Sequence, residues 1–273
     1  MIILTTRLML VLLLAALMAT VLSAQAETPE ARDIMTQVDN RYTGDSSHAE
    51  AQLILIDRRE RERVRDLVMY ELEAEGTSKS IVFFRSPADV AGTSYLSHDH
   101  DGADNDAWLY LPALGQVRRV AAGDRAGAFM GSDFSYSDMD GMEIDWWQYR
   151  LLDDSQTVND HPVWHLEAVP HPDHADQVLE ETGYERARIW VRQDNLVLIR
   201  GQYWLADSDR SKYFSASELT EIDGIWTPLR LQMVTTRNGE REHSSVLSIS
   251  HIEYNSHSDA DLFTTRAMER GLE

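Results

Sequence analysis

The chain has 273 residues, no cysteine and a formal net charge of −21. Without cysteine it can hold no disulfide, thiolate metal site or thiol nucleophile, so its stability must come from its own core. The negative charge makes nucleic acid a poor partner, because binding it needs clustered positive charge. Only Lys79 and Lys212 are lysines, and an acidic, lysine-poor surface suits either a saline habitat or a GC-rich genome.

Residues 1–26 have the pattern of a cleavable signal peptide. Arg7 is followed by an apolar run over residues 8–22 and by the small-x-small motif Ala24-Gln25-Ala26. The run is short for a membrane span, so an uncleaved anchor is the weaker alternative. No cysteine follows it, which excludes a lipoprotein. We expect export to the periplasm and a single mature domain over residues 27–273.

A helix is predicted over residues 28–42, because Thr28 can cap it and Pro29 suits its first turn. Period-two alternation then predicts strands at residues 52–56, 63–73, 80–85, 93–97, 107–111, 116–120, 163–169, 184–192, 196–205, 212–222, 227–236 and 243–254. The polar stretches 153–160 and 171–182 are predicted to be loops. Roughly a dozen strands joined by short turns predict an antiparallel meander without βαβ units.

Several of these strands are charged on one face only. Arg186 and Arg188, for example, alternate with apolar neighbours. A sheet that is wet on one side must curl over its apolar side or cover it with helices. The helix at residues 28–42 and the segment 126–149 are the expected covers. The sequence therefore predicts a mainly β protein, a curved sheet with a helical lid.

Two histidine-containing regions are candidate metal sites. Residues 98–106 resemble a calcium loop, but the glycine and the terminal carboxylate fall out of register, which favours an acidic hairpin turn. On a strand, His161 and His165 share a face but lie about 13 Å apart, too far to bind one ion together. His171 and His174 fall in a proline-containing loop with no suitable third ligand. We expect no metal and no cofactor.

The sequence carries no pattern that specifies an enzyme. It has no Gly-x-Ser-x-Gly elbow, phosphate-binding loop or dinucleotide fingerprint. Asp138, Asp140, Glu143 and Asp145 could form an acid/base set for a hydrolase, which needs two carboxylates about 5–10 Å apart in a cleft. An acidic, capped lid helix explains them more simply, so we expect no catalytic residues.

The segment after residue 126 is unusually rich in methionine and aromatic residues. Such side chains either plug a sheet or form a movable lid over a cavity, because they repack around irregular apolar ligands. The candidate lipid-binding and lid residues are Met130, Phe134, Tyr136, Met139, Met142 and Trp146, with Trp108 and Tyr110 on the preceding strand. Gly127 and Gly131 are candidate hinges.

Six motifs, in order along nearly the whole mature chain, resemble one known family. They are ARDIMTQVDNRYTGDSS, SIVFFRSPADVAGTSYL, WLYLPALGQVRRV, MGSDFSYSDM, ARIWVRQDNLVLIRGQYW and DLFTTRAMER. The chain resembles the LolA-like periplasmic outer-membrane lipoprotein-sorting proteins, with MGSDFSYSDM as the most diagnostic motif. The resemblance implies a half-open antiparallel β-barrel whose concave apolar face is covered by helices.

The resemblance also implies a function. Such a protein shields the acyl chains of a lipid or lipoprotein during transfer toward an outer-membrane acceptor. Members of this subgroup resemble partners of RND-type exporters, which makes an inner-membrane RND-type transporter the expected donor. The alternative is a non-transporting periplasmic adaptor, in which the same fold would have a filled interior and an exposed apolar rim.

Overall fold

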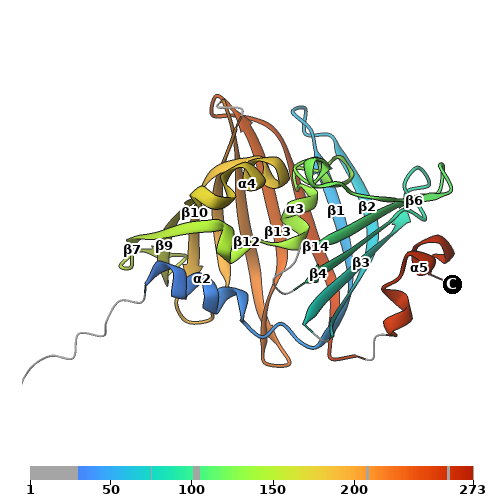
Figure 1. Ribbon diagram of the computed structural model, residues 1–273, viewed down its shortest axis with the longest axis horizontal. Coiled ribbons are helices and arrows are strands. Elements are labelled where there is room, and N and C mark those ends of the chain that lie inside the picture. Colours follow the sequence, from blue (N-terminus) through green and yellow to red (C-terminus); the bar gives the residue numbers. More distant parts are fainter. Residues whose placement is uncertain (1–29, 75, 101–104, 207–208, 257–258, 273) are drawn as a thin grey trace, which may run out of the picture.

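The computed structural model describes residues 30–74, 76–100, 105–206, 209–256 and 259–272 (Figure 1). The predicted signal peptide and part of the acidic 98–106 turn lie outside the described residues. The strands are β1 (Ser46–Ile56), β2 (Glu62–Ala74), β3 (Thr77–Ser86), β4 (Ser94–His100), β5 (Asp106–Leu111), β6 (Gln116–Arg119), β7 (Trp147–Asp153), β8 (Thr157–Val158), β9 (His161–Pro170), β10 (Tyr184–Arg192), β11 (Leu198–Leu205), β12 (Arg210–Ile222), β13 (Ile225–Arg237) and β14 (Glu240–Tyr254).

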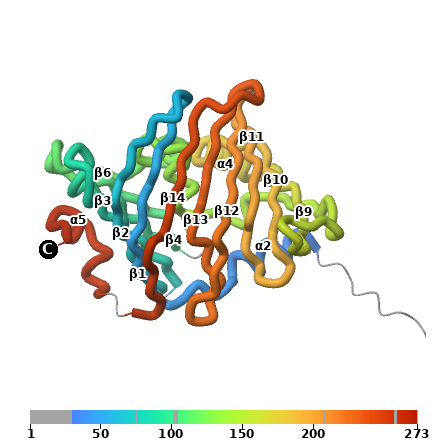
Figure 2. The backbone as a smooth tube through the Cα atoms, turned by 180° about the vertical axis from the view of Figure 1, so that it is seen from behind, coloured from blue at the N-terminus to red at the C-terminus, as the bar shows by residue number. Residues whose placement is uncertain are grey.

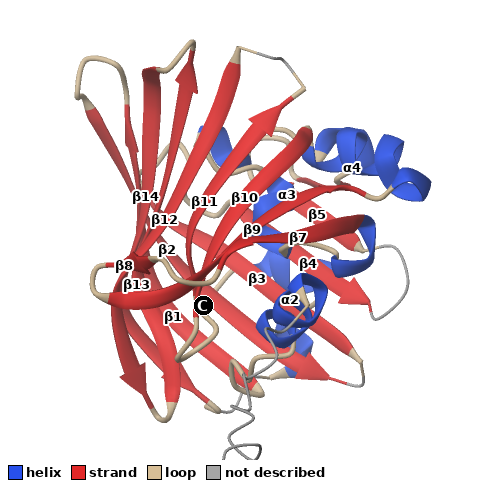
Figure 3. Ribbon diagram, turned by 90° about the vertical axis from the view of Figure 1, so that its left-hand side faces the viewer, coloured by secondary structure: helices blue, strands red, loops and turns tan. Residues whose placement is uncertain are grey.

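The strands of the described residues form one 14-stranded sheet. Its order is β6-β5-β4-β3-β2-β1-β14-β13-β12-β11-β10-β9-β7, with β8 paired to β9, and every pairing is antiparallel. The first and last long strands, β1 and β14, pair in the middle, so the two halves of the chain meet there. The edge strands β6 and β7 do not pair with each other, which leaves the curved sheet open (Figure 3). The predicted half-open antiparallel barrel is confirmed.

The helices are α2 (Ala31–Asp39), α3 (Tyr136–Asp140), α4 (Ala175–Thr182) and α5 (Thr265–Arg270), with 3₁₀ turns η1 (Ala122–Asp124), η2 (Phe129–Gly131), η3 (Ile144–Trp146), η4 (Pro172–His174) and η5 (Ala260–Leu262). Helices α2, α3 and α4 lie on the concave side of the sheet (Figures 1 and 3). The opposite view shows the outer face of β1, β14, β13 and β12 without a helix over it (Figure 2). No helix within the described ranges is long and apolar enough to cross a membrane.

Alternation along the strands decides which side chains enter the core. On β1, Leu53 and Leu55 are buried while their neighbours are more exposed. Leu53 lies opposite Leu247 of β14, which in turn lies opposite Leu231 of β13. Apolar side chains of successive strands therefore line the concave face in rows, because cross-strand neighbours share a face of the sheet.

Three local predictions need correction. The predicted loop at residues 171–182 contains η4 and α4; the helix was missed because Val178 is its only fully buried residue. Residues 157–158 of the other predicted loop form the short strand β8. The cover segment 126–149, expected to be part of a helical lid, is helical only in the short α3 and two 3₁₀ turns, and from Trp147 onward it is the edge strand β7.

The end of the chain packs on the outer face of the sheet. Helix α5 contacts β4, β5 and β6, away from the concave side (Figure 2). Phe263 and Met268 are buried there against Ile81, Phe83 and Leu96. This second cluster separates the outer side of β3–β6 from solvent and is distinct from the main core.

Candidate functional site

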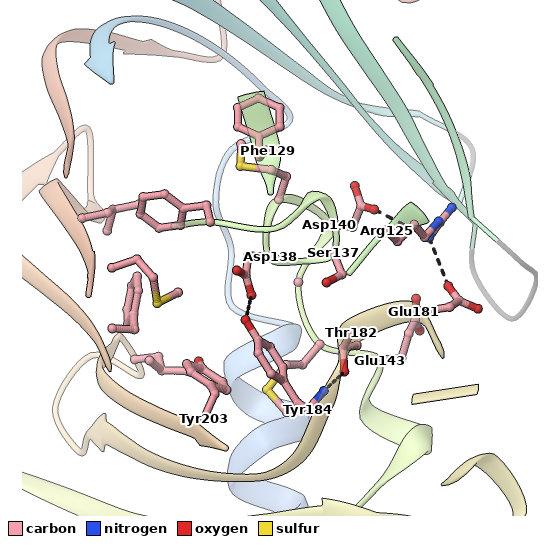
Figure 4. Close-up of a pocket in the computed structure, with 18 of the residues that line it drawn as sticks. Arg125, Phe129, Ser137, Asp138, Asp140, Glu143, Glu181, Thr182, Tyr184 and Tyr203 are labelled. Atoms are coloured by element: carbon pink, nitrogen blue, oxygen red, sulfur yellow. Dashed lines mark hydrogen bonds and ion pairs between the residues drawn. The ribbon is translucent and has the colours of Figure 1, made fainter. Parts of the chain in front are cut away.

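A cavity of about 540 Å³ lies between the concave face of the sheet and residues 122–146, which we call the lid segment (Figure 4). Its volume is in the range of about 300–1,000 Å³ that is usual for small-molecule sites. The apolar wall consists of Leu53, Leu67, Met69, Val82, Leu198, Tyr203, Phe214, Leu231, Met233 and Leu247 from strands, Met35 and Val38 from α2, and Phe129, Phe134, Met139, Met142, Ile144 and Trp146 from the lid segment, with Trp147 beside it.

The lid segment is held by its own hydrogen bonds. The Phe129 N–H donates to the Phe134 carbonyl at 2.7 Å, which closes a tight loop around η2. Met130 has a left-handed backbone with φ of 50° inside this loop, and Arg65 of β2 donates to its carbonyl. Ser135 then starts α3 with a capping box, since its side chain accepts from the Asp138 N–H and its N–H donates to the Asp138 carboxylate.

One buried carboxylate attaches this loop to the sheet. The Asp133 side chain is 2% exposed and accepts hydrogen bonds from Ser245, at 2.6 Å, and from His243, both on β14. Burial alone would raise the pKa of Asp133, but the hydrogen bonds from His243, Ser245 and Thr235 together lower it. The hydrogen bond between His243 and Asp133 raises the pKa of His243. The pair is therefore an ionic anchor between the lid segment and β14.

The other end of the cavity is polar and centres on Arg125. Its Nη1 lies 3.6 Å from Asp140 Oδ2 and 3.5 Å from Glu181 Oε2, and the guanidinium also donates to the carbonyl of Asn105. The Arg125 side chain is 8% exposed and that of Asp140 is 6% exposed. Arg125 follows η1, Asp140 lies on α3 and Glu181 lies on α4. The two ion pairs therefore hold the lid segment and α4 together (Figure 4).

Next to Arg125 is a second buried polar group. Tyr184 of β10 donates to Asp138 Oδ1 at 2.7 Å (Figure 4). Lys212 of β12 donates to Asp138 Oδ2 at 3.3 Å and to the Tyr184 hydroxyl at 3.1 Å. The carboxylate that caps α3 is thus neutralised from the sheet side, and the lid helix is tied to two strands.

Two carboxyl groups at the polar end have raised pKa values. Burial raises the pKa of Asp140 to about 6, although Arg125 opposes the shift. Burial and the nearby Asp99 raise the pKa of Glu143 to about 7, against the hydrogen bond that Asn105 donates to it at 2.9 Å. Both carboxyls therefore hold a proton more readily than ordinary surface acids.

The structure places four of the predicted residues in the cavity wall: Phe134, Met139, Met142 and Trp146. Met130 and Tyr136 pack against the main core beside it. Trp108 and Tyr110 do not line the cavity, because the alternation of β5 directs them to the outer cluster with α5. Their assignment to lipid binding, like that of the other six, stays a prediction.

The candidate hinges differ in their surroundings. A Cβ on Gly127 would lie 2.8 Å from the Asp124 carbonyl oxygen, whereas one on Gly131 would meet nothing within 4 Å. Gly131 instead needs its left-handed φ of 72°. Both positions therefore favour glycine for backbone reasons, and motion at them stays a prediction.

Sequence reasoning had named Asp138, Asp140 and Glu143 but missed the residues that they meet at the polar end of the cavity. Arg125, Tyr184 and Glu181 belong to segments far apart in the chain, and no local pattern joins them. Lys212 did carry a signal, since it is one of two lysines and shares the inward face of β12 with the apolar Phe214, two residues later. Among the described residues, no three His, Asp or Glu side chains are arranged to hold a metal ion.

An open antiparallel half-barrel with a covered apolar cavity is the class of protein that this fold and site define. Three solved structures have a similar fold. A domain from Vibrio parahaemolyticus, named for outer membrane lipoprotein sorting, is 26% identical with a TM-score of 0.78 over 88% of this chain and 98% of its own. A DUF1329 family protein from Desulfovibrio piger ATCC 29098 is 27% identical with a TM-score of 0.77 over 87% of this chain and 97% of its own.

A LolA superfamily protein from Nitrosomonas europaea shares the fold, with a TM-score of 0.64 at 19% identity over 88% of this chain and all of its own. No curated protein matches the sequence significantly. A family model described as "Uncharacterized protein"-like matches residues 76–270, and the chain belongs to this family. The LolA-like resemblance found in the sequence is confirmed.

Proposed function

We propose that this protein is a non-enzymatic carrier that shelters the apolar chain of a lipid or lipoprotein in the cavity under its lid segment. The observation that carries the proposal is the cavity itself, about 540 Å³ of space walled mainly by apolar side chains. A filled interior would have favoured the non-transporting adaptor. The name of the Vibrio domain, which refers to lipoprotein sorting, agrees with the proposal.

The cellular location and the partners in this proposal rest on the sequence and on the resemblance to LolA-like proteins. Residues 1–26 act as a signal peptide, the single domain 27–273 works in the periplasm, and cargo moves toward an outer-membrane acceptor. An inner-membrane RND-type transporter is the proposed donor. Cross-linking in cells, followed by identification of the captured membrane proteins, tests the donor and acceptor; capture of neither would remove this part of the proposal.

The energetics of such a carrier follow from burial. Each methylene moved out of water contributes about 0.8 kcal/mol, so a single long acyl chain would bind very tightly to an open cavity. Phe134, Met139 and Met142 reach the same cavity from the lid segment. The packing of these lid side chains competes with the cargo for the same space. If closure of the empty lid is favourable by a few kcal/mol, cargo binding is weakened by that amount and exchange becomes reversible.

Native mass spectrometry with organic extraction, on protein purified mildly from the periplasm, tests the carrier directly. A bound amphiphile is expected. Met233→Trp should block binding, because Met233 is 2% exposed and lines the cavity on β13. Leu114→Trp is the matched control, since Leu114 is 54% exposed on the β5–β6 turn.

Overpacking at Met233 costs about 1–3 kcal/mol, so the fold of each variant is checked by thermal unfolding. Leu231→Trp fills the same cavity from a half-buried position and serves if Met233→Trp does not fold. A clean apo mass, together with no binding of alkyl probes to the wild-type protein, would refute the carrier.

A further inference from the structure

The cavity lining contains more acidic than basic side chains. Among the described lining residues there are six carboxylates, Asp39, Glu71, Asp138, Asp140, Glu143 and Glu181, and one cation, Arg125. Lys212 adds a second cation from behind the wall, where it is bonded to Asp138. Even with both cations counted, carboxylates outnumber positive groups in the lining.

These carboxylates differ in the hydrogen-bond donors and cations that satisfy them. Asp138 is satisfied by Tyr184, Lys212 and the N-terminal backbone of α3. Glu143 receives one neutral hydrogen bond, from Asn105, in the lining of the same cavity. One Arg125 serves both Asp140 and Glu181, at ion-pair distances of 3.6 and 3.5 Å.

One of these carboxylates is satisfied only weakly by the protein. The Asp140 side chain is 6% exposed and lines the cavity; Tyr95 donates to its Oδ1, and Arg125 Nη1 lies 3.6 Å from its buried Oδ2, beyond normal hydrogen-bond distance. Buried carboxylate oxygens usually have close donors, since leaving one without them is costly. Because its charge is shared with only one distant cation, Asp140 adds negative potential at this end of the cavity.

The neighbours of Glu143 are also mainly acidic. After burial, the groups that raise its pKa are Asp99 on β4, Asp39 on α2 and Glu181 on α4, so carboxylates approach it from three elements. Arg125 is engaged by Asp140 and Glu181. A positively charged group entering from the cavity would relieve this repulsion, whereas an anionic group would increase it.

Building on the proposed carrier function, we propose that its cargo is an amphiphile whose head group carries an ammonium, bound by Glu143, Asp140 and Glu181 while the alkyl chain fills the apolar cavity. The ammonium donates hydrogen bonds to the carboxylates, and the chain contacts the wall of β1, β2, β13 and β14. Anionic amphiphiles are disfavoured by the same carboxylates.

Three probes of equal chain length test the head-group preference: dodecylammonium, dodecanol and dodecanoate. Binding is followed by the fluorescence of Trp146 and Trp147, which line the cavity. We expect dodecylammonium to bind about tenfold or more tightly than dodecanoate, the effect of one charge-assisted hydrogen bond. Equal binding of all three, or tighter binding of dodecanoate, overturns the head-group inference alone. Binding of none refutes the carrier function itself.

Glu143→Gln separates charge from shape, because glutamine keeps an acceptor for Asn105. It should remove most of the ammonium preference while leaving dodecanol affinity unchanged. Glu240→Gln, an exposed position on the β13–β14 hairpin, alters net charge equally and should change neither. The wild-type affinity for dodecylammonium should fall as pH drops below about 7, where Glu143 becomes protonated; an unchanged preference in Glu143→Gln counts against the proposal.

Ammonium groups occur on free amphiphiles and on the peptide part of acylated proteins. A palmitoylated peptide with a lysine beside the acyl group, compared with its acetyl-lysine form, provides a second arm. Where dodecylammonium is preferred among the dodecyl probes, a preference for the ammonium form of the peptide as well identifies an acylated protein as the source. No preference in the peptide arm then identifies a free lipid.

Discussion

The anchor between Asp133 and β14 leads to a prediction that can be worked out quantitatively. Asp133→Asn removes the charge while keeping the size of the side chain, and it weakens the hydrogen bonds with His243 and Ser245. Hydrogen bonds to a charged group contribute about 1.5–3 kcal/mol each, and asparagine retains one acceptor. We therefore expect the free energy of unfolding to fall by about 2 kcal/mol.

The loss of unfolding free energy in Asp133→Asn should depend on pH in a defined direction. Folding raises the pKa of His243 through its bond with Asp133, so this contribution is fully present below about pH 6.5 and is lost as pH rises through the folded pKa. Folding lowers the pKa of Asp133, so its contribution is present above about pH 4 and is lost as pH falls through the folded value. The difference between wild type and variant should be largest between these limits.

The size of the pH-dependent part is limited by solvent. The His243 side chain is 47% exposed, and screening at such a site keeps the pH-dependent difference to about 1 kcal/mol or less. Urea unfolding of both proteins at about pH 5.5 and about pH 8.5 measures it. The reasoning is refuted if the variant is as stable as wild type, or if its deficit is as large at the higher pH.

Three further predictions concern the lid segment and the outer cluster. Arg125→Met should lower the free energy of unfolding by about 3–5 kcal/mol in urea, because it leaves two buried carboxylates without their cation. Gly127→Ala should cost about 1–3 kcal/mol, since the new Cβ would press on the Asp124 carbonyl; Gly131→Ala, with open space, should cost about 1 kcal/mol through backbone strain alone. Phe263→Ala should cost about 3–5 kcal/mol and leave alkyl-probe affinity unchanged, because this residue lies on the outer face.

The secondary structure followed largely from local patterns. The apolar alternation of β1, β10 and β13 reflects which residues face the core, and neighbouring residues alone encode it. The exceptions are informative. Helix α4 buries only Val178 completely, and β7 is an edge strand of seven residues, so neither had a strong periodic signal.

Only some of the candidate lid residues lie at the cavity, and the reason is physical. Phe134, Met139, Met142 and Trp146 lie in the segment that crosses the open face, so composition alone located them at the cavity. Trp108 and Tyr110 have equally suitable side chains but occupy the outward positions of β5. Which face of that strand is covered by α5 depends on where the last residues of the chain fold, and β5 itself contains no information about that.

The sequence by itself determined the class of this protein: an antiparallel sheet, apolar on one face, with a methionine- and aromatic-rich segment to cover it. These features are local, because period-two alternation and composition are properties of neighbouring residues. The tertiary structure decided the electrostatics of the site. Arg125 meets Glu181, and Asp138 meets Lys212, only because the sheet curls and the lid segment crosses it. Pairings between residues so far apart are set by the packing of whole elements, and the charge of the cavity follows from them.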